Sequence, residues 1–167
     1  INFTAGGALT QTITVTVNGD VLVENNETII ITLSNPVGGG LGANPGTGTI
    51  TNDDAAVVTL SGGIAQNEGN AGTVTYTFTA TLNNAVQGGF TVPYTTGGGT
   101  ATAGSDYADN DGTLTFTGTA GETKTWTVAV SGDVTVELDE TFQGALGALS
   151  GAPAGVTTAG SPQTATI

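Results

Sequence analysis

The sequence predicts an all-β protein made of tandem antiparallel β-sandwiches, and its periodicity, turn residues and internal repetition all indicate this fold class. Apolar and polar residues alternate with a period of two in segments such as TVTYTFTATL at 73–82, which places every second side chain on one face of a strand. Gly, Asn, Asp and Pro separate these segments, and no segment shows helical spacing. A sandwich is the simplest way to bury such half-apolar strands.

An internal duplication indicates tandem modules. Residues 1–33 align with residues 114–146 at a constant offset of 113 without a gap, and the match resumes between TGTI (47–50) and TATI (164–167) at an offset of 117. Repetition at this spacing is typical of module arrays. The strands keep their register while the Gly/Pro/Ala loops between them differ in length.

Taken in order, residues 55–167 are expected to form one nearly complete module of about seven strands. These strands are expected near 56–60, 72–83, 89–95, 112–117, 123–131, 139–147 and 162–167. Residues 1–54 supply only the counterparts of the last four strands, as the C-terminal half of another module. We therefore expect this half to be completed by chain preceding Ile1, or by strands from a neighbouring copy or another protein.

Composition narrows the possible functions. One Lys and no Arg or His stand against 14 acidic residues, giving a net charge of −13, so nucleic acids and anionic membranes are not expected as partners. The absence of Cys and His removes thiolate and imidazole chemistry. The chain has no apolar run long enough to span a bilayer, no signal peptide and no Met, and we interpret it as a piece of a longer polypeptide.

The acidic residues are concentrated in repeated loops. The stretch GDVTVELDETF (132–142) holds Asp133, Glu137, Asp139 and Glu140 without a basic residue, and GDVLVENNETI (19–29) repeats the pattern. Carboxylates about 4 Å apart repel each other by roughly 1 kcal/mol per pair in water. A cation would relieve this repulsion, and Ca²⁺ suits carboxylate and carbonyl oxygens best. The alternative is a solvated acidic rim that keeps a Thr-rich surface soluble.

Longer motifs resemble the Calx-β domain. The segment from Gly104 to Leu146 contains G-x-D-Y, G-x-L-x-F and G-D-x-x-x-E-x-x-E elements in order, and LSNP (33–36) and TITNDD (49–54) extend the resemblance over most of the chain. Calx-β domains are Ig-like β-sandwiches that serve as calcium-binding regulatory modules in sodium–calcium exchangers and as tandem repeats in large bacterial surface proteins. The resemblance therefore implies an Ig-like fold and bound calcium.

The resemblance also implies the calcium ligands. In both modules they are side-chain carboxylates, together with the backbone carbonyl groups of Leu22 and Thr135. In the second module they are Glu68, Asp106, Asp133, Thr135, Glu137 and Glu140, and in the first they are Asp20, Leu22, Glu24, Glu27, Asp53 and Asp54. The first two ligand positions of the first module precede Ile1, and the terminal acids of the second would follow Ile167. Asn26 stands where the second module has Asp139.

Other features favour packing or turns over chemistry. Trp126 occupies the position of Ile13 in the repeat, in phase with apolar neighbours, which favours core packing over sugar stacking. Asn-Asp-Gly at 110–112 suits a tight turn better than a metal loop. The paired carboxylates lack an aromatic-lined cleft, so we do not expect an enzyme. Only Tyr94 and Tyr107 could offer a carbohydrate-binding surface, and for Tyr107 packing at the sandwich edge is favoured.

These observations predict a calcium-binding structural repeat of an extracellular bacterial surface protein, adhesin or filament, acting as a calcium-stiffened spacer. Its partners are expected to be adjacent repeats or a neighbouring copy. A calcium-sensing regulatory module of a membrane transporter and a carbohydrate-binding module remain alternatives. A spacer should stiffen with calcium, whereas a sensor should change conformation strongly.

Overall fold

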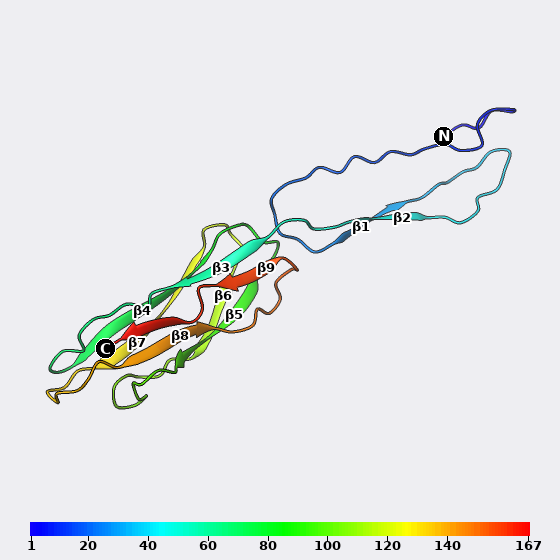
Figure 1. The fold of residues 1–167 in the computed structure, drawn as a ribbon. Coiled ribbons are helices and arrows are strands. Elements are labelled where there is room, and N and C mark those ends of the chain that lie inside the picture. Colours follow the sequence, from blue (N-terminus) through cyan, green and yellow to red (C-terminus); the bar gives the residue numbers. More distant parts are fainter.

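The computed structural model describes residues 1–167 and contains strands but no helix. Eight of the strands form two four-stranded sheets packed face to face, and the other two form a separate hairpin in residues 1–54 (Figure 1). The structure has no helix that is long and apolar enough to cross a bilayer. The all-β, sandwich fold predicted from the alternating sequence is confirmed.

One sheet has the order β7-β4-β3-β9 and the other the order β10-β8-β5-β6. The strands of the first are β3 (Ala56–Ser61), β4 (Thr73–Leu82), β7 (Thr123–Ser131) and β9 (Val156–Ala159). Those of the second are β5 (Phe90–Gly97), β6 (Gly112–Phe116), β8 (Thr141–Leu146) and β10 (Gln163–Thr166). All neighbours run antiparallel except β3 and β9, which are parallel.

The core lies between the two sheets and follows the predicted alternation. In β4, Tyr76, Phe78, Ala80 and Leu82 are buried while the intervening Thr residues are more exposed. Trp126 stacks on Phe78 with ring centroids 5.0 Å apart. Its predicted role in core packing is therefore confirmed, and its indole ring is not available for sugar stacking.

The strand count from the sequence missed β9. Its sequence VTTA is short and follows a Gly/Pro/Ala loop, so it carries no clear period-two signal. It forms because the edge of β3 pairs with it in parallel from Ala56↔Val156 to Thr59↔Ala159. Parallel pairing joins segments far apart in the sequence, which local patterns do not reveal.

Residues 1–54 form fewer strands than the four expected. Only β1 (Glu27–Ile31) and β2 (Gly46–Ile50) form, as an antiparallel pair extending away from the sandwich (Figure 1). The expected strand at 10–18 is absent. Its counterpart β7 is held by nine residue pairs with β4, and no strand equivalent to β4 lies beside residues 10–18 in the structure. Without that partner, the backbone groups of 10–18 have no ladder to join.

Most of the exposed large apolar side chains belong to this part of the chain. They are Ile1, Phe3, Leu9, Ile13, Val15, Val17, Val21, Ile30, Leu33, Val37 and Leu41. Val23 is the one fully buried residue in this part of the chain, and it belongs to the core of the sandwich. The completion of residues 1–54 by other strands stays a prediction.

Candidate metal centres

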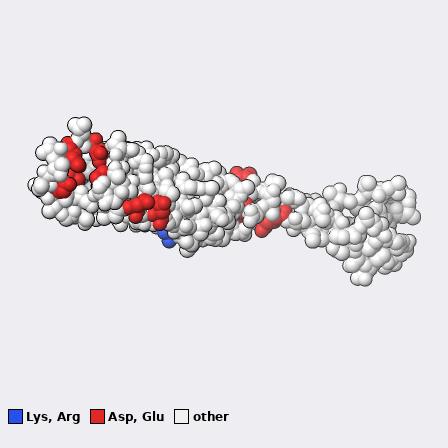
Figure 2. Space-filling view, turned by 90° about the horizontal axis from the view of Figure 1, so that it is seen from below, with Lys and Arg blue, Asp and Glu red and all other residues white.

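The acidic side chains gather at one end of the sandwich and at the neck where residues 1–54 join it (Figure 2). A third group lies on the flank beside the single Lys. We name the first two sets the end cluster and the junction cluster. Each lines its own pocket, and together the two pockets include all twelve residues predicted as calcium ligands.

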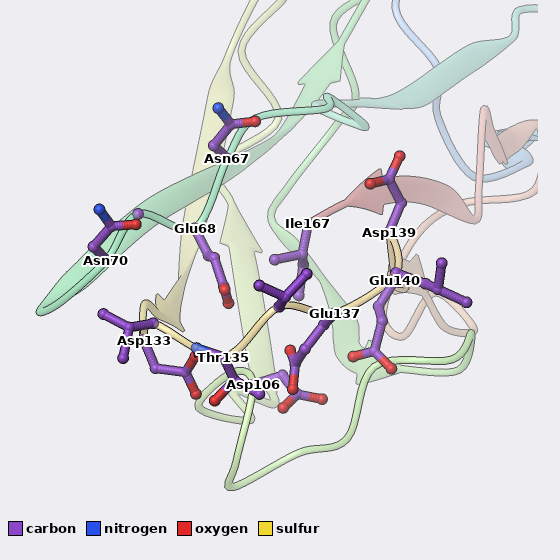
Figure 3. A pocket seen from close by; sticks show the side chains of 14 residues that line it. Asn67, Glu68, Asn70, Asp106, Asp133, Thr135, Glu137, Asp139, Glu140 and Ile167 are labelled. Carbon is purple, nitrogen blue, oxygen red and sulfur yellow. Dashed lines mark hydrogen bonds between the residues drawn. The ribbon is translucent and has the colours of Figure 1, made fainter.

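The end cluster lies where three loops converge at the tip of the sandwich (Figure 3). One loop precedes β4, one surrounds residues 102–107, and one joins β7 to β8. Its predicted ligands are Glu68, Asp106, Asp133, Thr135, Glu137 and Glu140, with Asn67, Asn70, Asp139 and Ile167 also lining the pocket.

Local backbone contacts bring the loops of the end cluster together. A Cβ on Gly132 would lie 2.6 Å from the carbonyl oxygens of Glu68 and Gly69, so only glycine allows this close approach. The Gly132 N–H donates to the carbonyl of Gly72 at 3.0 Å. The loop before β4 is thereby held against the loop after β7, which places Glu68 opposite Asp133.

Asp106 and Glu140 are fixed by the ends of the strands. The Ser131 N–H donates to the Asp106 carbonyl at 2.8 Å, and the Thr102 N–H donates to the Asp106 carboxylate at 2.6 Å. Glu140 and Ile167 exchange two backbone hydrogen bonds of 3.2 and 2.8 Å. The backbones of Asp106 and Glu140 are therefore held in place by the end of β7 and by the residue after β10, respectively.

The carboxylates of the end cluster repel one another. Partial desolvation raises the pKa of Glu137 above its usual value, and the charges of Asp133 and Glu68 raise it further. The pKa of Glu140 is raised first by its hydrogen bond with Asp106. Neighbouring carboxylates raise one another's pKa because each disfavours the charged form of the other, and a bound cation would remove this penalty.

No cation of the protein relieves this repulsion. The single salt bridge joins Lys124 to Glu122 at 2.9 Å, outside both pockets. In this structure, no group of three or more Asp or Glu side chains is arranged to hold a metal ion. The end-cluster pocket measures about 420 Å³, many times the roughly 30 Å³ share of a water molecule. Ligation would therefore require the loop side chains to draw inward.

The donor chemistry nevertheless fits calcium. The pocket offers carboxylates from three loops together with backbone carbonyl groups, and it contains no thiolate, imidazole or ammonium group. Calcium takes 6–8 oxygen ligands in flexible geometry, whereas zinc prefers nitrogen and sulfur. Exposed side chains on loops can adjust to such a geometry without disturbing the sheets.

The junction cluster repeats this chemistry within residues 17–54, next to the start of the sandwich. Its predicted ligands are Asp20, Leu22, Glu24, Glu27, Asp53 and Asp54. Asp20 accepts a hydrogen bond from the Leu22 N–H at 2.9 Å, as Asp133 does from the Thr135 N–H at 2.6 Å. The turn that starts each acidic loop is thus the same in both copies. Desolvation and the charge of Glu27 raise the pKa of Glu24.

Asn52 organises the junction cluster, and the sequence reasoning missed it. Its side-chain oxygen accepts from the Glu24 N–H at 3.0 Å, and its amide group donates to the carbonyls of Asp54 and Ala154. It therefore ties the acidic loop, the terminal acids and the sandwich together. Its place directly before the acids in TITNDD was a signal, because short polar residues at strand ends often fix loops.

Asp139 was also left out of the predicted ligand set although it lines the end-cluster pocket. The two tyrosines considered for carbohydrate binding are packed instead. Tyr107 is 4% exposed and stacks on Phe142, and Tyr94 stacks on Trp126 with centroids 4.6 Å apart. The packing role favoured for Tyr107 is confirmed. Calcium ligation by the twelve residues stays a prediction.

The fold and the two clusters define a class of protein: Ig-like β-sandwich modules that gather carboxylates on the loops at the ends of their sheets. Within this class, the Calx-beta domain model matches residues 1–60 and 51–167. The chain therefore belongs to the Calx-beta domain family.

Solved structures of the same fold are similar to it. The crystal structure of an apo-form Calx CBD1 domain has a TM-score of 0.55 and 23% identity, covering 68% of this chain and 96% of that one. The crystal structure of CBD12 from CALX1.2 has a TM-score of 0.52 and 24% identity, covering 66% of this chain and 43% of that one. At these identities the similarity shows the fold alone. A comparison with curated protein sequences found no match.

Proposed function

We propose that the chain binds calcium at the end cluster and the junction cluster and acts as a calcium-stiffened structural repeat, without enzymatic activity. The observation that carries this proposal is the convergence of all twelve oxygen donors, far apart in the sequence, in two pockets that contain no basic residue. Calcium binds such a site in the folded protein and hardly at all in the unfolded chain. At a calcium concentration of one hundred times Kd, this preference adds about 2.7 kcal/mol to the free energy of unfolding.

Thermal unfolding in calcium and in chelator tests the binding. We expect calcium to raise the melting temperature of the full chain and the double variant D133N/E137Q to lose the part of that increase due to the end cluster. The matched control is D109N, which removes a negative charge at an exposed position outside both pockets. Equal melts of the unsubstituted chain in calcium and chelator would rule out the proposed binding.

The junction cluster suggests how calcium would stiffen the array. Asp53 and Asp54 precede β3 with only Ala55 between, and the Asn52 side chain links this segment to Ala154 of the sandwich. An ion held between these acids and the loop of Glu24 would clamp the two parts. We expect the double variant D53N/D54N to increase flexibility in small-angle scattering while the sandwich stays folded. Equal flexibility of both proteins in calcium would argue against a clamp.

The same scattering experiment separates a spacer from a calcium sensor. A spacer becomes stiffer in calcium without a large change in the shape of each part, whereas a sensor in a membrane transporter changes conformation strongly. We favour the spacer and place it in an extracellular bacterial surface protein or adhesin, because the chain is rich in Thr and Gly and has no Cys and one Lys. Protease treatment of intact cells carrying the protein should release its peptides, and their release only after lysis would contradict this location.

A further inference from the structure

Val23 docks residues 1–54 onto the sandwich. Its N–H donates to the Ala85 carbonyl at 3.1 Å, and its carbonyl accepts from the Gln87 N–H at 2.8 Å. The side chain is fully buried and belongs to the sandwich core together with Val86. A Cβ added to Gly155 would lie 3.5 Å from Val23 Cγ1. We name this site, formed by residues 85–87 and Gly155, the valine socket.

The internal duplication places Val136 at the position of Val23. Both follow the Asp of an acidic loop by three residues, and both loops begin with the same aspartate-capped turn at Asp20 or Asp133. Yet Val136 is 98% exposed whereas Val23 is fully buried. Because the local sequence and turn are alike, the difference in exposure depends on whether a second surface contacts the valine.

The side chains around Val136 make its exposure distinctive. Val134 and Leu138 are also 81% and 90% exposed, so three apolar residues alternate with acids on one loop. Single exposed apolar residues are ordinary, but a contiguous group on a loop indicates a contact surface. The docked counterpart Val23 shows what kind of surface covers this position.

We propose that the loop at 133–140 is a docking element whose Val136 enters the valine socket of a further module of the same kind. That module would be joined after Ile167 as the sandwich is joined to residues 1–54. This inference rests on the proposed role as a structural repeat and names its partner. A second copy of this chain does not offer the site, because its own Val23 already fills it. The partner must present an open backbone carbonyl and N–H like those of Ala85 and Gln87.

The absence of cysteine makes a direct test possible, since a single introduced thiol is the only one in the protein. The test chain is residues 1–167 followed by a second copy of residues 51–167, because Ile167 is the counterpart of Ile50 in the repeat. V136C in the first copy is treated with a thiol reagent in millimolar calcium, and the same substitution in the 167-residue chain gives the reference rate. We expect labelling in the extended chain to slow by about tenfold or more, since a docked thiol reacts only after local opening.

The matched control is V134C, whose counterpart Val21 stays 75% exposed beside the docked Val23. It should react at the same rate in both chains. Because a cysteine could weaken docking, amide hydrogen exchange of Val136 provides a second measurement without substitution, and exchange should slow because the Val23 N–H is hydrogen-bonded in the socket. Unchanged labelling and unchanged exchange in the extended chain would overturn the docking. Calcium binding is judged separately from the melting temperature, so either proposal can fail alone.

Discussion

The two equivalent valines allow a stability prediction with an internal reference. Val23 is fully buried and Val136 is 98% exposed in the same chain, so V23A and V136A remove the same atoms from opposite environments. Burial of a CH₂ group stabilises by about 0.8 kcal/mol, and Val→Ala removes two carbon atoms. The transfer contribution is therefore about 1.6 kcal/mol, and the residual cavity raises the total cost of V23A to about 2–3 kcal/mol. V136A should change stability by less than about 0.5 kcal/mol.

Urea unfolding of the full-length variants at fixed calcium measures both values, and thermal unfolding should show V23A melting about 10 °C lower. Hydrogen exchange locates the effect, because V23A should speed exchange of the Gln87 N–H, which donates to the Val23 carbonyl. If V23A and V136A differed by less than about 0.5 kcal/mol, the burial of Val23 in the sandwich core would not describe the protein in solution.

Further predictions concern the core, an ion pair and the end cluster. A Cβ on Gly144 would lie 2.7 Å from an aromatic ring, so G144A should cost about 1–3 kcal/mol in urea unfolding, whereas G97A, with open space, should cost far less. Burial raises the pKa of Glu122, but hydrogen bonds from Lys124 and Thr117 outweigh it and hold the pKa below its usual value. The E122Q variant should therefore be less stable than the unsubstituted chain at pH 7, and this difference in the free energy of unfolding should vanish as the pH falls through that lowered pKa. A difference in stability that persisted at pH 2 would refute this. The pKa of Glu140 is raised, so lowering the pH through it should relieve repulsion and shrink the calcium-induced rise in melting temperature, while a rise independent of pH would contradict binding by these carboxylates.

Much of the candidate site could be predicted because its information is local. The repeated acidic loops, the turn at Asp133 and the strand ends that flank them are all visible in a few consecutive residues. A resemblance to known domains then linked Glu68 and Asp106 to that loop, and the structure places them in one pocket. Asn52 was missed because its importance lies in contacts with Glu24 and Ala154, 28 and 102 residues away.

The sequence by itself determined the strand periodicity, the inward face of β4 and the positions of the acidic loops, because each depends on the alternation or turn chemistry of neighbouring residues. Tertiary structure alone decided that VTTA becomes β9, that residues 10–18 do not form a strand, and that Val23 is buried while Val136 is exposed. These outcomes depend on a partner: a free edge of β3, an equivalent of β4, and a valine socket. Strand pairing and burial satisfy backbone hydrogen bonds and remove apolar surface from water only when that second surface is present, and a single stretch of sequence does not contain it.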